Sequence, residues 1–491
     1  MQNFHQISII FKKTIDNFKK VLYNIFVRLY ERHDTMVAEL EIYKNKKVFF
    51  SGIGGVSMSS LALILKDNGF TVCGSDRTES ANVKKLKDKG INIIIGQTTE
   101  NITDDIGLVV RTAAVSTESD EMKKAEALGI PIMERCTLLG YVMKAYKNRF
   151  NICGTHGKTT TTSMVALILI QAGLDPTVTV GGDFKKIGGN LRIGSMNYFV
   201  CEACEYVESF LKFYPSDTLI LNVEEDHLDY YKDINHIKSA FRKFAQKTEH
   251  LIVANGDSQN VIDAVKDLPN VVFFGLENGK YTAKNIKTER LTTQYDLYCD
   301  GVFLAHITLK VAGLHNVMDS LGACALCLEN GIDISYIKSA LFDFGGADRR
   351  MEYKGTFMGA DIYDDYAHHP TEIETTVKSA RQKCPKRVVA LFQPHTYTRT
   401  KAFKDDFKRV LSLMDKVYIA DIYAAREKNP GNISSRDIAD GLNNAVYAGS
   451  LENALLMIEN ELKEGDMFIT IGAGDVYKVG ESLIKKAGEC V

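Results

Sequence analysis

The stretch R-F-N-I-C-G-T-H-G-K-T-T-T-T, from Arg149 to Thr162, decides how the central part of the chain folds. The apolar residues 150–153 predict a short strand, the glycines that follow predict a turn, and the apolar run 163–171 predicts a helix. In a strand, glycine-rich turn and helix in this order, free backbone N–H groups and the positive end of the helix face an anion. The stretch therefore predicts a phosphate-binding loop.

Each residue type in this loop has a chemical reason. A Cβ at Gly154 or Gly157 would block the approach of the backbone or its required φ. Lys158 is expected to reach the outer phosphates, and a threonine hydroxyl to hold Mg²⁺. Ile152 stands where the full P-loop pattern has its first glycine, so a strand-to-helix turn that merely carries Gly-Lys-Thr is the alternative. The flanking strand and helix favour a site for a nucleoside triphosphate.

The bulk composition excludes several classes of protein. The 491 residues suggest about three domains. The 60 basic and 62 acidic residues nearly balance, so the composition gives no sign of a basic nucleic-acid-binding surface. The sequence has no run of about 18 apolar residues and no secretory pattern at its start, so neither a membrane span nor a signal peptide is expected. The ten scattered cysteines favour the reducing cytoplasm, and Cys201/Cys204 and Cys324/Cys327 are expected to be buried thiols instead of a zinc site.

Residues 1–45 predict an amphipathic, mildly basic helical extension. It could lie on a membrane surface or a partner, or it could be an appendage, with Met36 as the true start. The sequence leaves its role open.

A βαβ unit follows in residues 46–147. Its glycine-rich turn is Gly52, Ile53, Gly54 and Gly55, and the next strand ends at Ser75 and Asp76. Asp76 lies about 20 residues past the glycines, the position of the ribose-binding acid in dinucleotide-binding domains. Such a turn could serve NAD, a UDP group or no ligand. Residues 91–96 and 107–115 predict two further strands with a helix between them.

In residues 148–344, acidic side chains follow two predicted strands. Glu205 comes after Y-F-V-C-E, and Asp226 and His227 come after T-L-I-L-N-V. Side chains at the ends of parallel strands beside a phosphate loop are candidate Mg²⁺ ligands. A β-rich passage then leads to a helix with Asn316 near its start.

Residues 345–491 predict a small parallel α/β unit whose polar residues gather at the strand ends. Arg349 and Arg350 lie in a turn before a strand, suited to gripping a phosphate. Pro370 is expected to begin a helix after D-D-Y-A-H-H, and Q-P-H-T-Y-T-R-T follows a later strand.

Taken together, the chain from residue 46 to about 480 resembles the Mur ligase family. The resemblance depends on nine motifs in series: G-I-G-G, G-T-H-G-K-T-T-T-T-S-M, E-A-C-E with S-F-L, D-H-L-D, G-L-H-N, R-R-M-E-Y-K-G, D-D-Y-A-H-H-P-T-E-I, Q-P-H-T-Y-T-R-T and G-A-G-D-V. It implies an α/β fold of three domains: a Rossmann-like UDP-sugar domain (46–147), a central P-loop ATPase-type domain (148–344) and a Rossmann-like amino-acid domain (345–491).

The resemblance also implies a reaction. The motifs D-D-Y-A-H-H-P-T-E-I and Q-P-H-x-Y-x-R-T are similar to those of the alanine-adding branch. That branch joins L-alanine to the lactyl carboxylate of UDP-N-acetylmuramate through an acyl phosphate, with ATP and Mg²⁺. The step serves peptidoglycan synthesis in the cytoplasm, and hence cell shape and division. A monomer or weak homodimer is expected.

Residue by residue, the resemblance implies four groups. ATP would be bound by Gly154, Thr155, His156, Gly157, Lys158, Thr159, Thr160, Asn316, Arg350 and Asp365. The metal would be bound by Thr159, Glu205 and His227, and the UDP-sugar by Gly52, Ile53, Gly54, Gly55, Ser75 and Asp76. The amino-acid pocket would contain His369, His395 and Arg399, with Lys158, Arg350 and His369 as catalytic residues.

Three other functions stay open at this point: a ligase that recycles murein tripeptide, an NAD-binding oxidoreductase, and a non-catalytic relative that binds UDP-sugar or ATP. The sequence also departs from the family's usual spelling. Ser57 and Ser60 replace two glycines, Asp319 stands where asparagine is usual, and Met351 replaces a common phenylalanine. None of these changes removes a predicted catalytic group.

Overall fold

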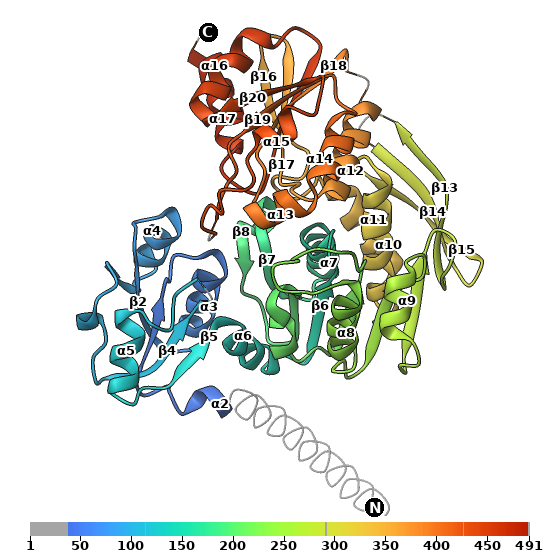
Figure 1. The fold of residues 1–491 in the computed structure, drawn as a ribbon. Coiled ribbons are helices and arrows are strands. Elements are labelled where there is room, and N and C mark those ends of the chain that lie inside the picture. The colour runs from blue at the N-terminus through green and yellow to red at the C-terminus, as the bar shows by residue number, and fades with distance from the viewer. Residues whose placement is uncertain (1–37, 113, 290–291, 384, 426, 490–491) are drawn as a thin grey trace, which may run out of the picture. The chain divides into compact units, whose positions relative to one another are not determined.

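The structure, a computed structural model, describes residues 38–489 except 113, 290–291, 384 and 426 (Figure 1). Most of the predicted N-terminal extension, residues 1–37, lies outside the described residues. The chain divides into two compact units, 1–147 and 148–491. Within the described residues, no helix is both long enough and apolar enough to cross a membrane.

The first unit contains a five-stranded parallel sheet in the order β3-β2-β1-β4-β5. Its strands are β1 (Lys47–Ser51), β2 (Thr71–Asp76), β3 (Asn92–Ile95), β4 (Ile106–Arg111) and β5 (Ile132–Glu134). Its helices are α2 (Ala38–Glu41), α3 (Val56–Asp67), α4 (Ala81–Asp88), α5 (Asp120–Ala127) and α6 (Arg135–Lys144). The order reverses between β1 and β4, and the turn Gly52–Gly55 follows β1 at this switch point, where ligands bind in such sheets.

One local prediction in this unit was wrong. The sequence suggested a helix between the strands now seen as β3 and β4, but only a single 3-10 turn, Thr99–Asn101, lies there. Only ten residues separate the two strands, from 96 to 105. This connection is too short for a packed α-helix with its two loops.

The second unit contains a ten-stranded sheet in the order β15-β14-β13-β12-β11-β10-β6-β9-β7-β8. Its strands are β6 (Asn148–Cys153), β7 (Thr177–Phe184), β8 (Gly189–Arg192), β9 (Tyr198–Glu202), β10 (Asp217–Ile220), β11 (Leu251–Asn255), β12 (Val271–Gly275), β13 (Tyr281–Glu289), β14 (Thr292–Cys299) and β15 (Val302–Leu309). Strands β12, β11, β10, β6, β9 and β7 are parallel to one another. The edge strand β8 pairs antiparallel with β7, and β13, β14 and β15 form an antiparallel meander.

Helices α7 (Lys158–Gln171), α10 (Leu314–Glu329) and α11 (Ile334–Asp343) pack on one another and on this sheet. The remaining helices of this part are α8 (Ile234–Ala245) and α9 (Gln259–Val265), with 3-10 segments at Lys185–Ile187 and Tyr206–Lys212.

Cys324 and Cys327 are buried in α10, and Cys201 is buried in β9, as expected. Cys204 is exposed, however, so the prediction that all four are buried was wrong for this residue. It lies in the loop after β9, where the chain has already left the sheet.

The same unit also contains a six-stranded sheet in the order β16-β17-β21-β18-β19-β20. Its strands are β16 (Glu352–Phe357), β17 (Ala360–Asp365), β18 (Arg387–Phe392), β19 (Lys416–Ala420), β20 (Ala445–Gly449) and β21 (Asp466–Ile471). Its helices are α12 (Pro370–Gln382), α13 (Tyr397–Ala402), α14 (Lys404–Leu411), α15 (Arg436–Ala439), α16 (Leu451–Glu461) and α17 (Tyr477–Glu489). The sheet is parallel except for its edge strand β16, which the prediction of a wholly parallel unit missed.

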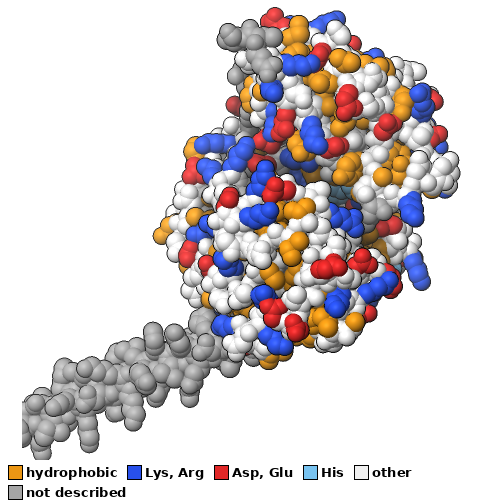
Figure 2. Space-filling model, turned by 90° about the vertical axis from the view of Figure 1, so that its left-hand side faces the viewer, with side chains coloured by type: hydrophobic (Ala, Val, Ile, Leu, Met, Phe, Trp, Pro, Cys, Tyr) orange, Lys and Arg blue, Asp and Glu red, His pale blue; other side chains and the backbone are white. Residues whose placement is uncertain are grey.

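Each face of this sheet carries an apolar cluster. One includes Ile373 and Val377 of α12 and Phe407 of α14, and the other includes Ile458 of α16 and Leu483 of α17. Residues 366–369 and 393–396 follow the ends of β17 and β18, and the rings of His368 and His395 lie 5.7 Å apart at this edge. On the face in view in Figure 2, Lys and Arg side chains are interspersed with Asp and Glu, in keeping with the balanced net charge of −2.

Candidate active site

The loop between β6 and α7 has the predicted strand–turn–helix shape. Gly154 and Gly157 have φ values of +147° and +82°, and a side chain at Gly154 would meet Asn222 N at 3.2 Å. A side chain at Gly157 would collide with the Asp319 carboxylate. Glycine is therefore required at both positions. The helix begins at Lys158, five residues before the predicted start at Ser163, so the threonines of the motif lie in its first turns.

Lys158 folds back over this loop. Its Nζ donates to Thr155 O at 2.9 Å and to Gly154 O, and lies 3.1 Å from Glu205 Oε2. Burial by itself lowers the pKa of Lys158, but the nearby charge of Glu205 outweighs burial and holds the pKa above its ordinary value. The lysine is therefore a cation beside the turn.

Glu205 and His227, two of the predicted metal ligands, lie together near Lys158. His227 Nε2 is 3.8 Å from Glu205 Oε1 and 3.8 Å from Asp226 Oδ2. Burial lowers the pKa of His227, which favours the neutral imidazole that binds metals. Glu205 is 2% exposed, and its Oε2 accepts no hydrogen bond although Lys158 is close. An unsatisfied buried carboxylate oxygen beside a neutral imidazole fits a divalent cation.

Thr159, the third predicted metal ligand, lies in the first turn of α7, beside Glu202. Glu202 ends β9 and accepts a hydrogen bond from Gly181 N at 2.7 Å. The sequence analysis missed this carboxylate, although it opens the E-A-C-E motif.

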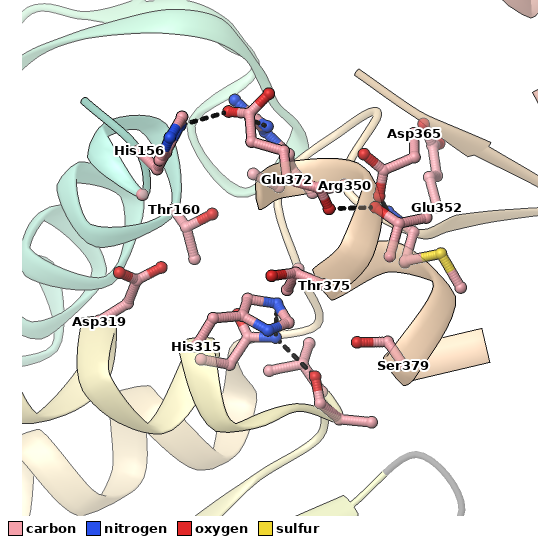
Figure 3. A pocket seen from close by; sticks show the side chains of 18 of the residues that line it. His156, Thr160, His315, Asp319, Arg350, Glu352, Asp365, Glu372, Thr375 and Ser379 are labelled. Carbon is pink, nitrogen blue, oxygen red and sulfur yellow. Dashed lines mark hydrogen bonds and ion pairs between the residues drawn. The ribbon is translucent and has the colours of Figure 1, made fainter. Parts of the chain in front are cut away.

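A cavity of about 840 Å³ opens beside the loop (Figure 3). The phosphate loop, the start of α10, the turn before β16, the end of β17 and α12 all contribute to its lining. The predicted ATP residues that line it are His156, Gly157, Thr160, Asn316, Arg350 and Asp365. Gly154, Thr155, Lys158 and Thr159, also predicted to bind ATP, are in the adjacent loop and are not among the lining residues.

The polar groups of this cavity differ in charge. Asp365 accepts hydrogen bonds from Met351 N at 2.9 Å and Ala367 N at 2.8 Å, and burial raises the pKa of its carboxyl to about 6. Burial by itself lowers the pKa of Arg350, but Glu372, 3.8 Å away, and Asp365 hold it above its ordinary value. Arg350 is thus a fixed cation facing the cavity.

The start of α10 supplies the opposite wall. Asn316 Nδ2 donates to Ala312 O at 2.7 Å and lies 3.0 Å from His315 Nε2. Burial lowers the pKa of His315 to about 4, so its imidazole is neutral. Burial also raises the pKa of Asp319 to about 7, so this carboxyl changes charge near neutral pH.

His156 joins the loop to the C-terminal part. Its Nδ1 is 3.1 Å from Glu372 Oε1, and its Nε2 is 3.4 Å from Glu224 Oε2. Burial by itself lowers the pKa of His156, but the two carboxylates outweigh it and raise the pKa to about 9. Neither acid was predicted from the sequence. Glu372 could have been predicted from the sequence, because it is the third residue of α12 and forms a capping box with His369 at the N-cap.

The three residues of the predicted amino-acid pocket follow strands β17 and β18. His369 caps α12, is nearly buried, and its Nε2 donates to Glu225 O at 3.1 Å. Burial lowers the pKa of His369. Arg399 Nη1 donates to His395 Nδ1 at 3.2 Å, so these two residues are in contact. His369 instead packs against His156, with ring centroids 4.9 Å apart and the ring planes tilted by 40°.

In the first unit, the predicted UDP-sugar residues form one compact turn. Gly52 N and Ile53 N each donate to Ser75 O at 2.9 Å, and Gly54 N donates to Asp76 Oδ2 at 2.8 Å. One oxygen of Asp76 therefore braces the glycine turn itself.

Behind this turn, the fully buried Glu121 accepts hydrogen bonds from Ser51 Oγ and from Asn101 Nδ2. The sequence analysis missed this support, because the three residues are far apart in the chain.

Comparison with known proteins tests the resemblance directly. Three family descriptions match in series: the Mur ligase family catalytic domain over residues 47–147, the Mur ligase middle domain over 152–327, and the Mur ligase glutamate ligase domain over 349–474. The chain belongs to the Mur ligase family. The predicted family and the predicted α/β fold with parallel sheets are confirmed.

Individual Mur ligases match over nearly the whole chain. A UDP-N-acetylmuramate–L-alanine ligase from Acetivibrio thermocellus is 48% identical over 456 residues, covering 91% of this chain and 97% of the relative. A solved UDP-N-acetylmuramate–alanine ligase from Thermotoga maritima is 29% identical, with a TM-score of 0.79 and coverage of 91% and 100%. A solved murein peptide ligase from Psychrobacter arcticus is 23% identical with a TM-score of 0.69, covering 91% and 99%, and shows the shared fold.

Proposed function

We propose that this Mur ligase joins L-alanine to the lactyl carboxylate of UDP-N-acetylmuramate at the expense of ATP, as a cytoplasmic step of peptidoglycan precursor synthesis. The carrying observation is the 48% identity, over 91% of this chain, to a ligase named for these two substrates. The site supports the chemistry, because the Arg350 cation faces a cavity beside the loop that carries the Lys158 cation.

A carboxylate is a poor electrophile, so the reaction needs two steps. First, a carboxylate oxygen of UDP-N-acetylmuramate attacks the γ-phosphorus of ATP, which gives an acyl phosphate and ADP. The amine of L-alanine then attacks the acyl carbon, and inorganic phosphate leaves as the amide forms and the amine loses its proton. Both steps require positioning and neutralisation of negative charge.

Lys158 and Arg350 would supply this positive charge. Lys158 reaches the phosphates from the first turn of α7, and Arg350 faces the cavity from the turn before β16. The nucleotide would be held by Gly154, Thr155, His156, Gly157, Thr159, Thr160, Asn316 and Asp365 together with these two cations.

Thr159, Glu205 and His227 would hold Mg²⁺. The bound ion would neutralise charge on the phosphates as one is transferred. Glu205 keeps a carboxylate oxygen free of hydrogen bonds, and His227 presents a neutral imidazole, so both suit this role.

The substrates would occupy separate regions. UDP-N-acetylmuramate would bind in residues 46–147 at Gly52, Ile53, Gly54, Gly55, Ser75 and Asp76. ATP would bind mainly in residues 148–344, with Arg350 and Asp365 contributing from the C-terminal part. L-Alanine would bind in residues 345–491 near His369, His395 and Arg399. His369 is the candidate acceptor of the amine proton, because a lowered pKa keeps its imidazole unprotonated. We expect the enzyme to act as a monomer or weak homodimer, which sedimentation would test.

The deciding experiment measures phosphate release from ATP by the purified chain, with UDP-N-acetylmuramate and L-alanine omitted in turn. Sustained release is expected only when both are present. Release that is independent of both would contradict the ligase assignment.

A second assay replaces L-alanine with the murein tripeptide, and preference for the tripeptide would favour the recycling ligase. An NAD-dependent oxidoreductase is not favoured, because it would leave the Lys158–Glu205–His227 cluster without a role.

A further inference from the structure

A second group of metal-binding side chains lies apart from the predicted Mg²⁺ ligands. His156, Glu224 and His369 each offer one ligand atom, and these atoms lie within 4.8 Å of one another. They come from three places in the fold: the phosphate loop, the segment after β10, and the N-cap of α12. From this geometry we propose that His156, Glu224 and His369 form a binding site for a transition-metal divalent cation such as Zn²⁺. The inference does not rest on the proposed reaction.

His156 is arranged as a metal-binding histidine. Its Nδ1 is 3.1 Å from the buried Glu372 carboxylate, while its buried Nε2 has no hydrogen-bond partner. Metal-binding histidines commonly give their other ring nitrogen to a carboxylate, which fixes the ring and its tautomer. Glu372 therefore serves His156 as an orienting partner and leaves Nε2 to face the site.

The spacing already suits a tetrahedral ion. His156 Nε2 and Glu224 Oε2 are 3.4 Å apart. Two ligands with bonds of about 2.0–2.1 Å to one tetrahedral ion lie roughly 3.3 Å apart. A cation between these two atoms would take the place of the hydrogen on Nε2.

His369 can serve as the third ligand with little loss of hydrogen bonding. Its Nε2 contacts Glu225 O at 3.1 Å, and its Nδ1 accepts from Thr371 N at 3.3 Å. Binding through Nδ1 breaks only the hydrogen bond from Thr371 N, and Nε2 keeps its hydrogen bond to Glu225 O. Glu372 also holds the His369 backbone, since its Oε2 accepts from His369 N at 3.3 Å, so the same carboxylate supports both histidines.

The donor types select the metal. Two imidazole nitrogens and one carboxylate oxygen are a ligand set of Zn²⁺ sites that keep a fourth position open. Mg²⁺ prefers oxygen ligands in octahedral geometry and is disfavoured here. A bound ion would tie the phosphate loop to the start of α12.

The test uses Co²⁺ as a visible probe of four-coordinate sites, with the full chain in excess Mg²⁺ and without nucleotide. One equivalent of Co²⁺ is expected to give the strong visible absorption of a four-coordinate ion, and Zn²⁺ is expected to displace it. Glu224→Gln and His369→Asn should each weaken Co²⁺ binding at least about tenfold. Asparagine is a good N-cap, so the His369 variant keeps the start of α12 while losing its imidazole.

Two controls separate this site from its neighbours. Glu225→Gln changes the adjacent exposed carboxylate and should leave Co²⁺ binding unchanged. His227→Gln alters the predicted Mg²⁺ site and should also leave the absorption in place. The proposal is overturned if no four-coordinate absorption develops, or if it is lost in His227→Gln but retained in Glu224→Gln and His369→Asn. Circular dichroism would confirm that each variant is folded.

Discussion

Arg399 and Asp226, 173 residues apart in the sequence, form a buried ion pair in which Arg399 Nε and Nη2 both donate to Asp226 Oδ1, at 3.1 and 2.9 Å. The side chains are only 9% and 7% exposed. The pair joins α13 to the segment after β10, and so connects the six-stranded sheet to the ten-stranded one. Asp226 also lies 3.8 Å from His227, so the predicted metal ligand and the predicted amino-acid pocket share one carboxylate.

Loss of the Asp226 charge should destabilise residues 148–491. Removing one partner of a buried pair leaves the other charge uncompensated, at a cost of about 3–5 kcal/mol. Asp226→Asn should therefore lower the free energy of unfolding by an amount of this order in urea denaturation. Asp406→Asn, which breaks a pair with both side chains more than half exposed, should cost less than about 1 kcal/mol. An equal loss of unfolding free energy in the two variants would show that the buried pair stabilises the fold no more than the exposed pair does.

The same ion pair predicts that the protein loses stability at low pH. Burial by itself raises the pKa of Asp226, but Arg399 and the nearby histidines outweigh it and hold the pKa well below its ordinary value. A depressed carboxyl pKa contributes stability above the unfolded-state pKa, which is lost as pH falls through the folded-state value. Wild type should therefore lose this contribution below about pH 4. The difference in unfolding free energy between wild type and Asp226→Asn should shrink over that range. A constant difference would contradict the assignment.

Lys158 should be needed for turnover and not for binding of the UDP-sugar. Lys158→Ala removes a cation from the phosphate loop, so kcat should fall at least about 100-fold, since loss of one stabilising donor costs that much in comparable sites. Calorimetric affinity for UDP-N-acetylmuramate should stay near that of wild type, because its predicted site lies in residues 46–147. Loss of UDP-sugar binding would mean that the proposed division of roles is wrong.

Asp319 should make ATP binding depend on pH. With burial raising its pKa to about 7, the carboxyl is largely neutral at pH 6 and largely ionised at pH 8. The ionised form puts a negative charge beside Gly157, where phosphate is expected. KM for ATP should therefore rise from pH 6 to pH 8, and the rise should be smaller in Asp319→Asn. Because ATP titrates identically in both assays, the difference between the two proteins isolates this residue, and identical pH profiles would exclude the effect.

Asp76 should support UDP-sugar binding by holding Gly54. A hydrogen bond to a charged group contributes about 1.5–3 kcal/mol, so Asp76→Ala should weaken UDP-N-acetylmuramate binding about 10- to 100-fold. Asp67→Ala, at the exposed end of α3, is the matched control and should bind normally. Binding of an ATP analogue should be unchanged in both variants. An Asp76 variant with normal UDP-sugar affinity would remove the residue from this role.

The sequence was most informative where a feature is local. The phosphate loop, the helix that begins at Pro370 and the turn that carries Arg350 all depend on residues close together in the chain, and each is present. Glycine, proline and alternating apolar residues determine such features through backbone sterics and burial. The antiparallel edge strand β16 was missed because strand direction depends on the neighbouring strand and not on its own residues.

The long-range contacts of the site could not be predicted from the sequence, for a different reason. His156 meets Glu372 across 216 residues, and Ser51 meets Glu121 across 70. Spacing in one sequence says nothing about which carboxylate will face which partner after folding. Burial is equally hidden, so the neutral His315 and the raised pKa of Asp319 could be found only from their surroundings.

The resting contacts of Lys158 have a consequence for the order of events. An ammonium has three hydrogens, and here two carbonyl oxygens and the Glu205 carboxylate surround them. A triphosphate that binds without a metal ion would have to compete with the Glu205 carboxylate for Lys158. A divalent cation bound to Glu205, as proposed above, would release Lys158 for the phosphates. We therefore expect the metal–nucleotide complex to bind in preference to the bare nucleotide.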